Sequence, residues 1–262
     1  MSDWLHSLPV PSMALTIFGF TYLLAIIIFA AVSALATGER AKSFQTVSPG
    51  MLPVLGIIFG LFVAFTAAQV WSDNDRAAAA VSSEASALRA VTLLGAGLPA
   101  EQASRLRELI RNYVEQAATV EWPMMARQEA SLRATPAALN EALQLVVSMT
   151  PQGSGHETAQ REIISALGSA LDARRQRIIV SQAEVNFVKW WCLYLQAICE
   201  LIVIALVHCG NRLASGIAMG LFATGVATSV LLIAAHDRPF IGQLSIGPGS
   251  LLQIMPGEPA SR

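Results

Sequence analysis

Four long stretches of this chain carry almost no charge, and they limit its possible folds more than any other feature. They are residues Ser12–Ala36, Pro49–Trp71, Phe187–Val207 and Leu213–Ala235. An α-helix rises about 1.5 Å per residue, so about 20 apolar residues cross a hydrocarbon core roughly 30 Å thick. Each stretch reaches that length. The sequence therefore predicts an all-α membrane protein with four transmembrane helices, in two pairs at 12–71 and 187–235.

The segment between the two pairs, residues 72–186, differs in composition and predicts a helical domain outside the membrane. Only 13% of all residues are charged, and most of those lie between Asp73 and Lys189. Apolar positions in this segment recur at helical spacing, as they do in amphipathic helices. We expect helices at Ala77–Leu94 and Ala100–Glu121, a third that Pro136 opens, and a fourth from about His156 that could run unbroken into the third span.

Charged residues near the ends of the spans predict which side of the membrane each segment occupies. An even number of spans places both termini and the middle domain on one side. That side holds Arg76, Arg89, Arg174, Arg175, Arg177, Lys189 and Arg238, whereas the other holds Arg40, Lys42 and Arg212. Positive residues collect on the cytoplasmic side. We therefore predict a multi-pass protein of the inner (plasma) membrane, with the middle domain, both termini and the C-terminal segment 236–262 in the cytoplasm.

The second span has two chemically distinct faces. At 100° per residue, Leu55, Phe59, Phe62, Thr66 and Gln69 fall on one face, and Gly56, Gly60 and Ala64 fall on another. Small residues let membrane helices approach closely, so the second face predicts helix packing. If several copies surround an axis, the first face would form a hydrophobic neck that widens into a polar vestibule. The alternative is a phenylalanine stripe that faces lipid or the protein core.

Glu200 is the one acidic residue deep within an apolar run, and Gln196 lies one turn before it. Ionisable groups inside a membrane are costly, which makes Glu200 a candidate for function. Two interpretations stay open. Glu200 could relay a proton or a cation, or a protonated Glu200 could hydrogen-bond another helix.

The sequence contains no pattern that is typical of an enzyme. It has no glycine-rich phosphate loop, nucleophile elbow or metal-ligand spacing, and its four histidines are scattered. We therefore predict no catalytic residue, no cofactor and no metal site. With a net charge of -1 and no dense basic block, the chain gives no reason to expect nucleic acid as a partner.

Three short motifs stand in order between Leu55 and Leu251. They are Glu-Ala-x-Ala beginning at Glu84, Arg-x-Tyr-Val at Arg111–Val114, and an Asp-x-Pro-Phe ending formed by Asp237, Arg238, Pro239 and Phe240. In this order and spacing they resemble a bacterial family of membrane proteins described as bestrophin-like. The resemblance implies four membrane helices, a cytosolic helical domain and a pentamer around a central pore. It also implies an apolar neck on the second membrane helix, which would fall to Leu55, Phe59, Phe62 and Thr66.

The function that these observations favour is a homo-oligomeric, anion-permeable ion channel in the lipid bilayer, with chloride as a candidate ion. The alternative is a non-conducting membrane scaffold or sensor that binds a soluble partner through the exposed face of Ala100–Glu121. A proton-coupled carrier that uses Glu200 is a third hypothesis.

Overall fold

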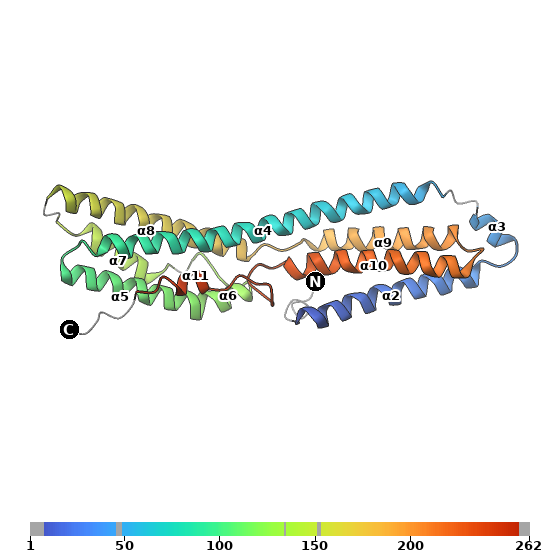
Figure 1. Cartoon of the computed structure of the whole chain (residues 1–262), viewed down its shortest axis with the longest axis horizontal. Coiled ribbons are helices and arrows are strands. Elements are labelled where there is room, and N and C mark those ends of the chain that lie inside the picture. The colour runs from blue at the N-terminus through green and yellow to red at the C-terminus, as the bar shows by residue number, and fades with distance from the viewer. Residues whose placement is uncertain (1–7, 46–48, 134, 151–152, 257–262) are drawn as a thin grey trace. The chain divides into compact units, whose positions relative to one another are not determined.

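The computed structural model of the protein describes residues 8–45, 49–133, 135–150 and 153–256 (Figure 1). Within these ranges the chain is helical and contains no β-strand. The chain divides into two compact units. The membrane unit comprises Met1–Ser72, Glu184–Arg238 and Gly242–Leu244, and the polar unit comprises the remainder. Helix α4 (Met51–Gly95) contributes its first half to the membrane unit and its second half to the polar unit.

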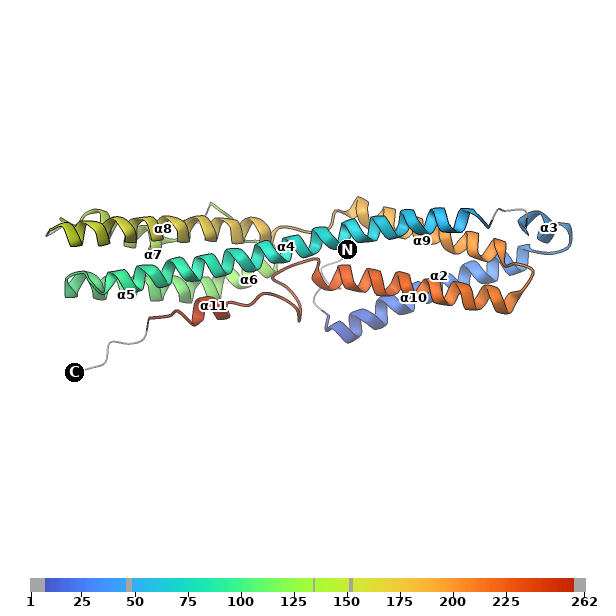
Figure 2. The ribbon, with the colours of Figure 1, turned by 45° about the horizontal axis from the view of Figure 1, so that its top comes forward.

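The membrane unit contains α2 (Val10–Leu35), the first half of α4, α9 (Phe187–Val207) and α10 (Arg212–His236), with the short α3 (Glu39–Gln45) following α2. Among the described residues, four helices are long and apolar enough to cross a membrane, which confirms the four predicted candidate membrane helices. Helix α10 packs along both α2 and α9, and Figure 2 shows α9 and α10 side by side.

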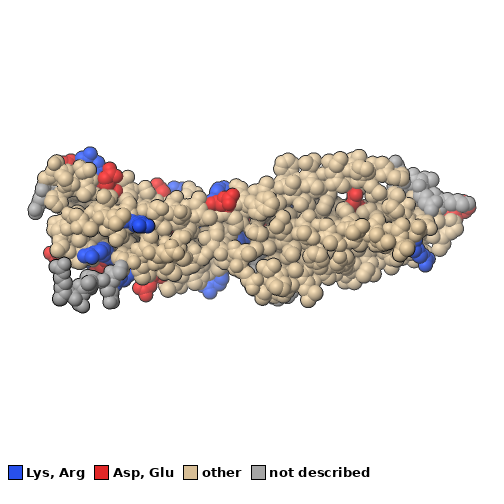
Figure 3. Space-filling view, viewed as in Figure 1, with Lys and Arg blue, Asp and Glu red and all other residues tan. Residues whose placement is uncertain are grey.

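Packing within the membrane unit relies on small and apolar side chains. Ala197 of α9 and Ala223 and Ala227 of α10 are buried, which lets these helices approach closely. Between membrane helices the stabilising force is close van der Waals contact rather than removal of apolar surface from water. The outer faces are also apolar, and Figure 3 shows a surface on this unit that is almost free of charged atoms.

The polar unit is built from the second half of α4, α5 (Ala100–Gln116), the π-helical turn η1 (Ala117–Glu121), α6 (Trp122–Ala126), α7 (Ala137–Val147), α8 (Ser154–Ser181) and α11 (Gly249–Leu252). As predicted, Pro136 immediately precedes α7. The core is formed by apolar side chains from each long helix, among them Leu88, Ile110, Leu139 and Leu167. Burial of each such side chain contributes about 1.5–3 kcal/mol relative to exposure in water.

Two expected helix boundaries differ from the structure. Residues 77–94 do not form a separate helix, because α4 runs without a break from Met51 to Gly95. Its polar stretch stays helical, and Asp73 there pairs with Arg76 one turn later, an arrangement that stabilises a helix.

The second difference is at the entry to the third span, where the expected continuous helix is interrupted. Helix α8 ends at Ser181, and α9 begins at Phe187. The side-chain oxygen of Asn186 accepts a hydrogen bond from the backbone N–H of Val188 (2.9 Å). Such an N-cap satisfies one of the free N–H groups at a helix start, and so fixes α9 as a new helix.

Candidate functional site

The five predicted pore-facing residues of α4 lie on the side of the helix that packs against other helices of the same chain. Phe59 is buried, with its ring centroid 5.7 Å from that of Phe222 on α10. Thr66 is also buried, and its hydroxyl donates to the backbone carbonyl of Phe62 (2.8 Å). Leu55, Phe62 and Gln69 are partly buried, and the side-chain oxygen of Gln69 accepts a hydrogen bond from the ammonium of Lys189. The stripe therefore helps to join α4 to α9 and α10.

A second apolar stripe lies about 120° around α4 from the first and is open. Ile57, Leu61 and Phe65 are spaced four residues apart, and their exposed fractions are 62%, 52% and 74%. Residues at this spacing share one face of a helix. Three large apolar side chains thus project outward from the protomer in one row.

The predicted helix-packing residues are divided between close contact and open space. A Cβ atom at Gly56 would lie 3.7 Å from Oε1 of Glu200, an ordinary van der Waals distance, so Gly56 lies beside Glu200 but an alanine would also fit there. A Cβ atom at Gly60 would meet no described atom within 4 Å, and Ala64 is exposed. Among the described residues, only Gly56 of these three lies beside another helix, and helix packing through this face stays a prediction.

Glu200 lies in the interior of the membrane unit, with only 4% of its surface exposed. Its Oε2 has no hydrogen-bond partner among the residues that the structure describes, and neither does Oε1 of Gln196. Among the described residues, Glu200 also makes no ion pair. The sequence identified this residue as unusual, and the structure shows that it is buried with one carboxylate oxygen lacking a hydrogen-bond partner among the described residues.

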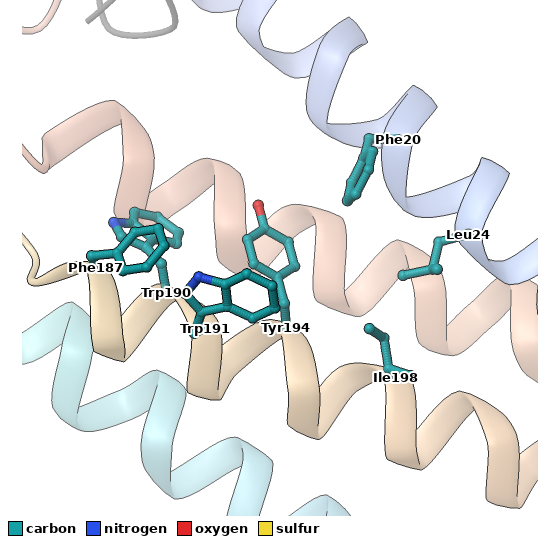
Figure 4. A pocket seen from close by; sticks show the side chains of 7 residues that line it. All are labelled: Phe20, Leu24, Phe187, Trp190, Trp191, Tyr194 and Ile198. Atoms are coloured by element: carbon teal, nitrogen blue, oxygen red, sulfur yellow. The ribbon is translucent and has the colours of Figure 1, made fainter. Parts of the chain in front are cut away.

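An aromatic groove of about 440 Å³ runs between α2 and α9 in the membrane unit (Figure 4). Trp190, Trp191 and Tyr194 project from α9, and Phe20 and Leu24 project from α2. Its lining residues carry no charge, so the groove is a surface for apolar contact rather than for chemistry. Tryptophan and tyrosine at the end of a membrane helix are typical of the interface between hydrocarbon and headgroups.

The motif residue Glu84 is the centre of a buried ionic cluster in the polar unit. Both Glu84 and Arg177 have side chains with 0% exposure. The guanidinium of Arg177 donates to both carboxylate oxygens of Glu84 (2.7 and 3.1 Å), and the hydroxyl of Tyr113 donates to Oε1. Glu121 extends the cluster because it accepts from Arg177 (2.9 Å) and from Arg174 (2.6 Å).

Trp122 contacts this ionic cluster, and the buried charges of the cluster shift the pKa values of Arg177 and Tyr113. The Arg177 guanidinium lies 4.6 Å from the centre of the Trp122 ring, a cation–π contact. Burial alone would lower the pKa of Arg177, but the carboxylate of Glu84 raises it above its ordinary value. Burial and the Glu84 carboxylate raise the pKa of Tyr113 well above 10. The cluster therefore holds Arg177 charged and Tyr113 neutral at physiological pH.

The Asp-x-Pro-Phe motif performs two separate tasks, one in each unit. In the membrane unit, Oδ1 of Asp237 accepts from the backbone N–H of Val185 (2.7 Å), and Arg238 pairs with Glu184 (2.9 Å). In the polar unit, Pro239 accepts from the N–H of Ile246 (2.8 Å). Phe240 packs edge-on against Trp122 there, with ring centroids 5.8 Å apart.

The sequence alone did not identify Arg177 as the partner of Glu84, or Arg174 and Glu121 as further members of this cluster. Arg174 and Arg177 were counted only as positive charges near a membrane end. The available signal was their spacing, because arginines three residues apart share a helix face and would require acidic partners if that face is buried. Among the described residues, no group of three or more His, Cys, Asp or Glu side chains is arranged to hold a metal ion.

Comparison with known proteins gives the family. A bacterial bestrophin homologue from Klebsiella pneumoniae, in a variant form, shares the fold with a TM-score of 0.72 at 13% identity, over 92% of this chain and 97% of that one. Another crystal structure of the Klebsiella pneumoniae homologue gives 0.68 at 13% identity, over 94% and 99%. No curated protein sequence matches. The model of the bestrophin-like domain matches residues 19–251, so the chain belongs to the bestrophin-like family.

Proposed function

We propose that the protein is the subunit of a homo-oligomeric ion channel in the inner membrane, with the polar unit and both termini in the cytoplasm. The bestrophin-like family and fold support a channel, and a pentamer is the assembly that the family resemblance implies. The excess of Arg and Lys around the polar unit supports its cytoplasmic side. Copies of α4 would surround the axis.

The observation that carries this proposal is the outward row of Ile57, Leu61 and Phe65 on α4. Rings of apolar side chains around an axis form a constriction that can gate ions by dewetting. This row takes the place of the neck expected from the sequence, because Phe59 and Thr66 are occupied in packing within their own protomer. A side chain buried inside one protomer is not available to an axis between protomers.

Anion permeation, with chloride as the candidate ion, is the selectivity that we propose. The edge of an aromatic ring carries partial positive charge, and an anion can pass beside it. Phe65 is the most exposed of the three proposed neck residues and is the one that could present such an edge.

Phe65→Ala tests the neck in purified protein reconstituted in planar bilayers. A smaller side chain would widen the constriction and ease its wetting, so we expect chloride conductance to rise several-fold. Leu221→Ala is the matched control, because Leu221 on α10 is similarly exposed (70%) but lies outside the proposed neck. Equal conductance in Phe65→Ala, Leu221→Ala and wild type would contradict the neck. Absence of any ion flux in all three would favour a scaffold or sensor.

A further inference from the structure

Two acceptor atoms inside the membrane unit have no donor. They are Oε2 of Glu200 and Oε1 of Gln196, and neither has a hydrogen-bond partner among the described residues. A buried polar atom that is not hydrogen-bonded costs about 1–3 kcal/mol, and a buried charge costs considerably more. Two such atoms, on residues one turn apart in the same helix, require a common explanation.

The spacing of the two side chains along α9 allows them to reach each other. They are four residues apart on α9, so they point from the same face of the helix, one turn from each other. Opposite them, Gly56 of α4 has no side chain, and its position leaves room beside the carboxyl group of Glu200. Figure 3 shows acidic atoms in a hollow whose rim is formed by uncharged residues.

The surrounding helices do not supply a positive charge for Glu200. Their titratable side chains are Tyr22 on α2, Lys189, Cys192, Tyr194 and Cys199 on α9, and Arg212 and His236 at the two ends of α10, with none on the first half of α4. His208 and Cys209 directly follow α9, and His208 is eight residues from Glu200, about 12 Å along the helix. The short α3 carries Glu39, Arg40 and Lys42, and it lies beside that end of α9, where the Cys209 thiol contacts the Ala41 carbonyl. Tyrosine and cysteine are neutral near pH 7. Lys189 lies 11 residues before Glu200, about 16 Å along the helix, and donates to Gln69.

We propose that Glu200 is a proton-binding site that is occupied at neutral pH, and that its carboxyl O–H donates to Oε1 of Gln196. One proton then satisfies both atoms, because it removes the charge from Glu200 and turns one of the two acceptors into a donor. The hydrogen bond links two turns of α9 at the place where α4 approaches. Loss of the proton at alkaline pH leaves an unpaired carboxylate among apolar helices and loosens the membrane unit.

Infrared difference spectroscopy of the full chain in lipid tests this site without requiring ion conduction. At neutral pH an exposed glutamate is ionised, so a carbonyl band of a protonated carboxylic acid reports a buried, neutral group. We expect this band in the wild type and its loss, by the amount of one carboxyl group per chain, in Glu200→Gln. Glu162→Gln is the matched control, because Glu162 lies exposed on α8 and its substitution leaves the band unchanged.

Two further measurements test the role of Gln196 as acceptor separately from the protonation of Glu200. Gln196→Leu removes the proposed acceptor and keeps Glu200, so the acid band persists but shifts in frequency. On alkaline titration, the thermal midpoint of the wild type falls as the band disappears, whereas the midpoint of Glu200→Gln does not. A wild type without the acid band at neutral pH, or a band that survives Glu200→Gln in full, overturns the proton site. An unshifted band in Gln196→Leu overturns the role of Gln196.

Discussion

Glu84 in the polar unit and Glu200 in the membrane unit are the same residue type, and both are buried, yet their surroundings are opposite. Glu84 accepts hydrogen bonds from Arg177 and Tyr113. Glu200 has a carboxylate oxygen without a partner among the described residues. The helices around Glu84 belong to a polar unit that carries most of the charges of the chain, whereas those around Glu200 are almost uncharged.

The comparison shows two ways in which a fold accommodates a buried acid. Near water, an arginine can be brought into the core with the carboxylate, and the pair is retained as ions with satisfied hydrogen bonds. Within hydrocarbon, the transfer of a second charge is also unfavourable, so neutralisation by a proton is the alternative.

The largest expected effect is that of Arg177→Met, which leaves Glu84 buried without its cation. Removal of one partner of a buried ion pair costs about 3–5 kcal/mol. The cation–π contact with Trp122 is lost as well. We expect hydrogen exchange in the second half of α4 and in α8 to accelerate by a factor of at least 100, measured by mass spectrometry on the protein in detergent.

Arg105→Met is the control for this substitution. Arg105 pairs with Glu108 and Glu141, but its side chain is 45% exposed and the carboxylates are exposed too. Surface pairs of this kind contribute about 0–1 kcal/mol, so exchange is expected to change little. If Arg177→Met were as mild as Arg105→Met, Glu84 would not depend on pairing, and its contrast with Glu200 would disappear.

Asp237 is intermediate between the fully paired Glu84 and the unpaired Glu200, and we expect its effect on stability to depend on pH. Burial raises its pKa from 3.8 to about 6, although the Val185 N–H bond and Arg238 favour the charged form. The folded state therefore holds this proton more tightly than the unfolded state. Stability contributed by the proton is complete below pH 3.8 and is lost as pH rises through about 6.

Asp237→Asn tests this dependence because the amide oxygen can still accept from Val185. The shift corresponds to at most about 3 kcal/mol. We expect the wild type to lose protection of the backbone around Val185 between pH 4 and pH 6, whereas Asp237→Asn shows a flat profile. Parallel pH profiles of the two proteins would show that Asp237 is not a protonated group of the kind proposed for Glu200.

Much of the fold follows from local sequence properties. The four apolar runs predicted the four candidate membrane helices, because length and hydropathy are read directly from consecutive residues. Helix α4 was harder to predict. The run from Ser72 to Arg76 is polar and predicts an interruption, but α4 continues through it, with Asp73 and Arg76 paired one turn apart.

The candidate site was harder to predict from the sequence, because helical periodicity shows which residues of α4 share a face but not which helices those faces contact. The stripe with Phe59 and Thr66 and the row with Leu61 and Phe65 are both apolar, and only packing against α10 shows which one is covered. The Glu84 cluster joins residues 93 positions apart, and pairing over such a distance has no local signal. Glu200 could be identified from the sequence without knowledge of its neighbours, because an acidic residue within an apolar run is itself a local signal.

The smallest expected effect separates charge from hydrogen bonding at Glu84. Tyr113→Phe removes one donor to the carboxylate and leaves Arg177 in place. A neutral donor to a charged acceptor contributes about 1.5–3 kcal/mol, and the remaining Arg177 bonds place the loss at the lower end of this range. We expect hydrogen exchange in the second half of α4 to accelerate about tenfold. An acceleration as large as that of Arg177→Met would mean that Glu84 requires every donor, and a buried acid in this unit would then be stabilised by complete hydrogen bonding rather than by its cation.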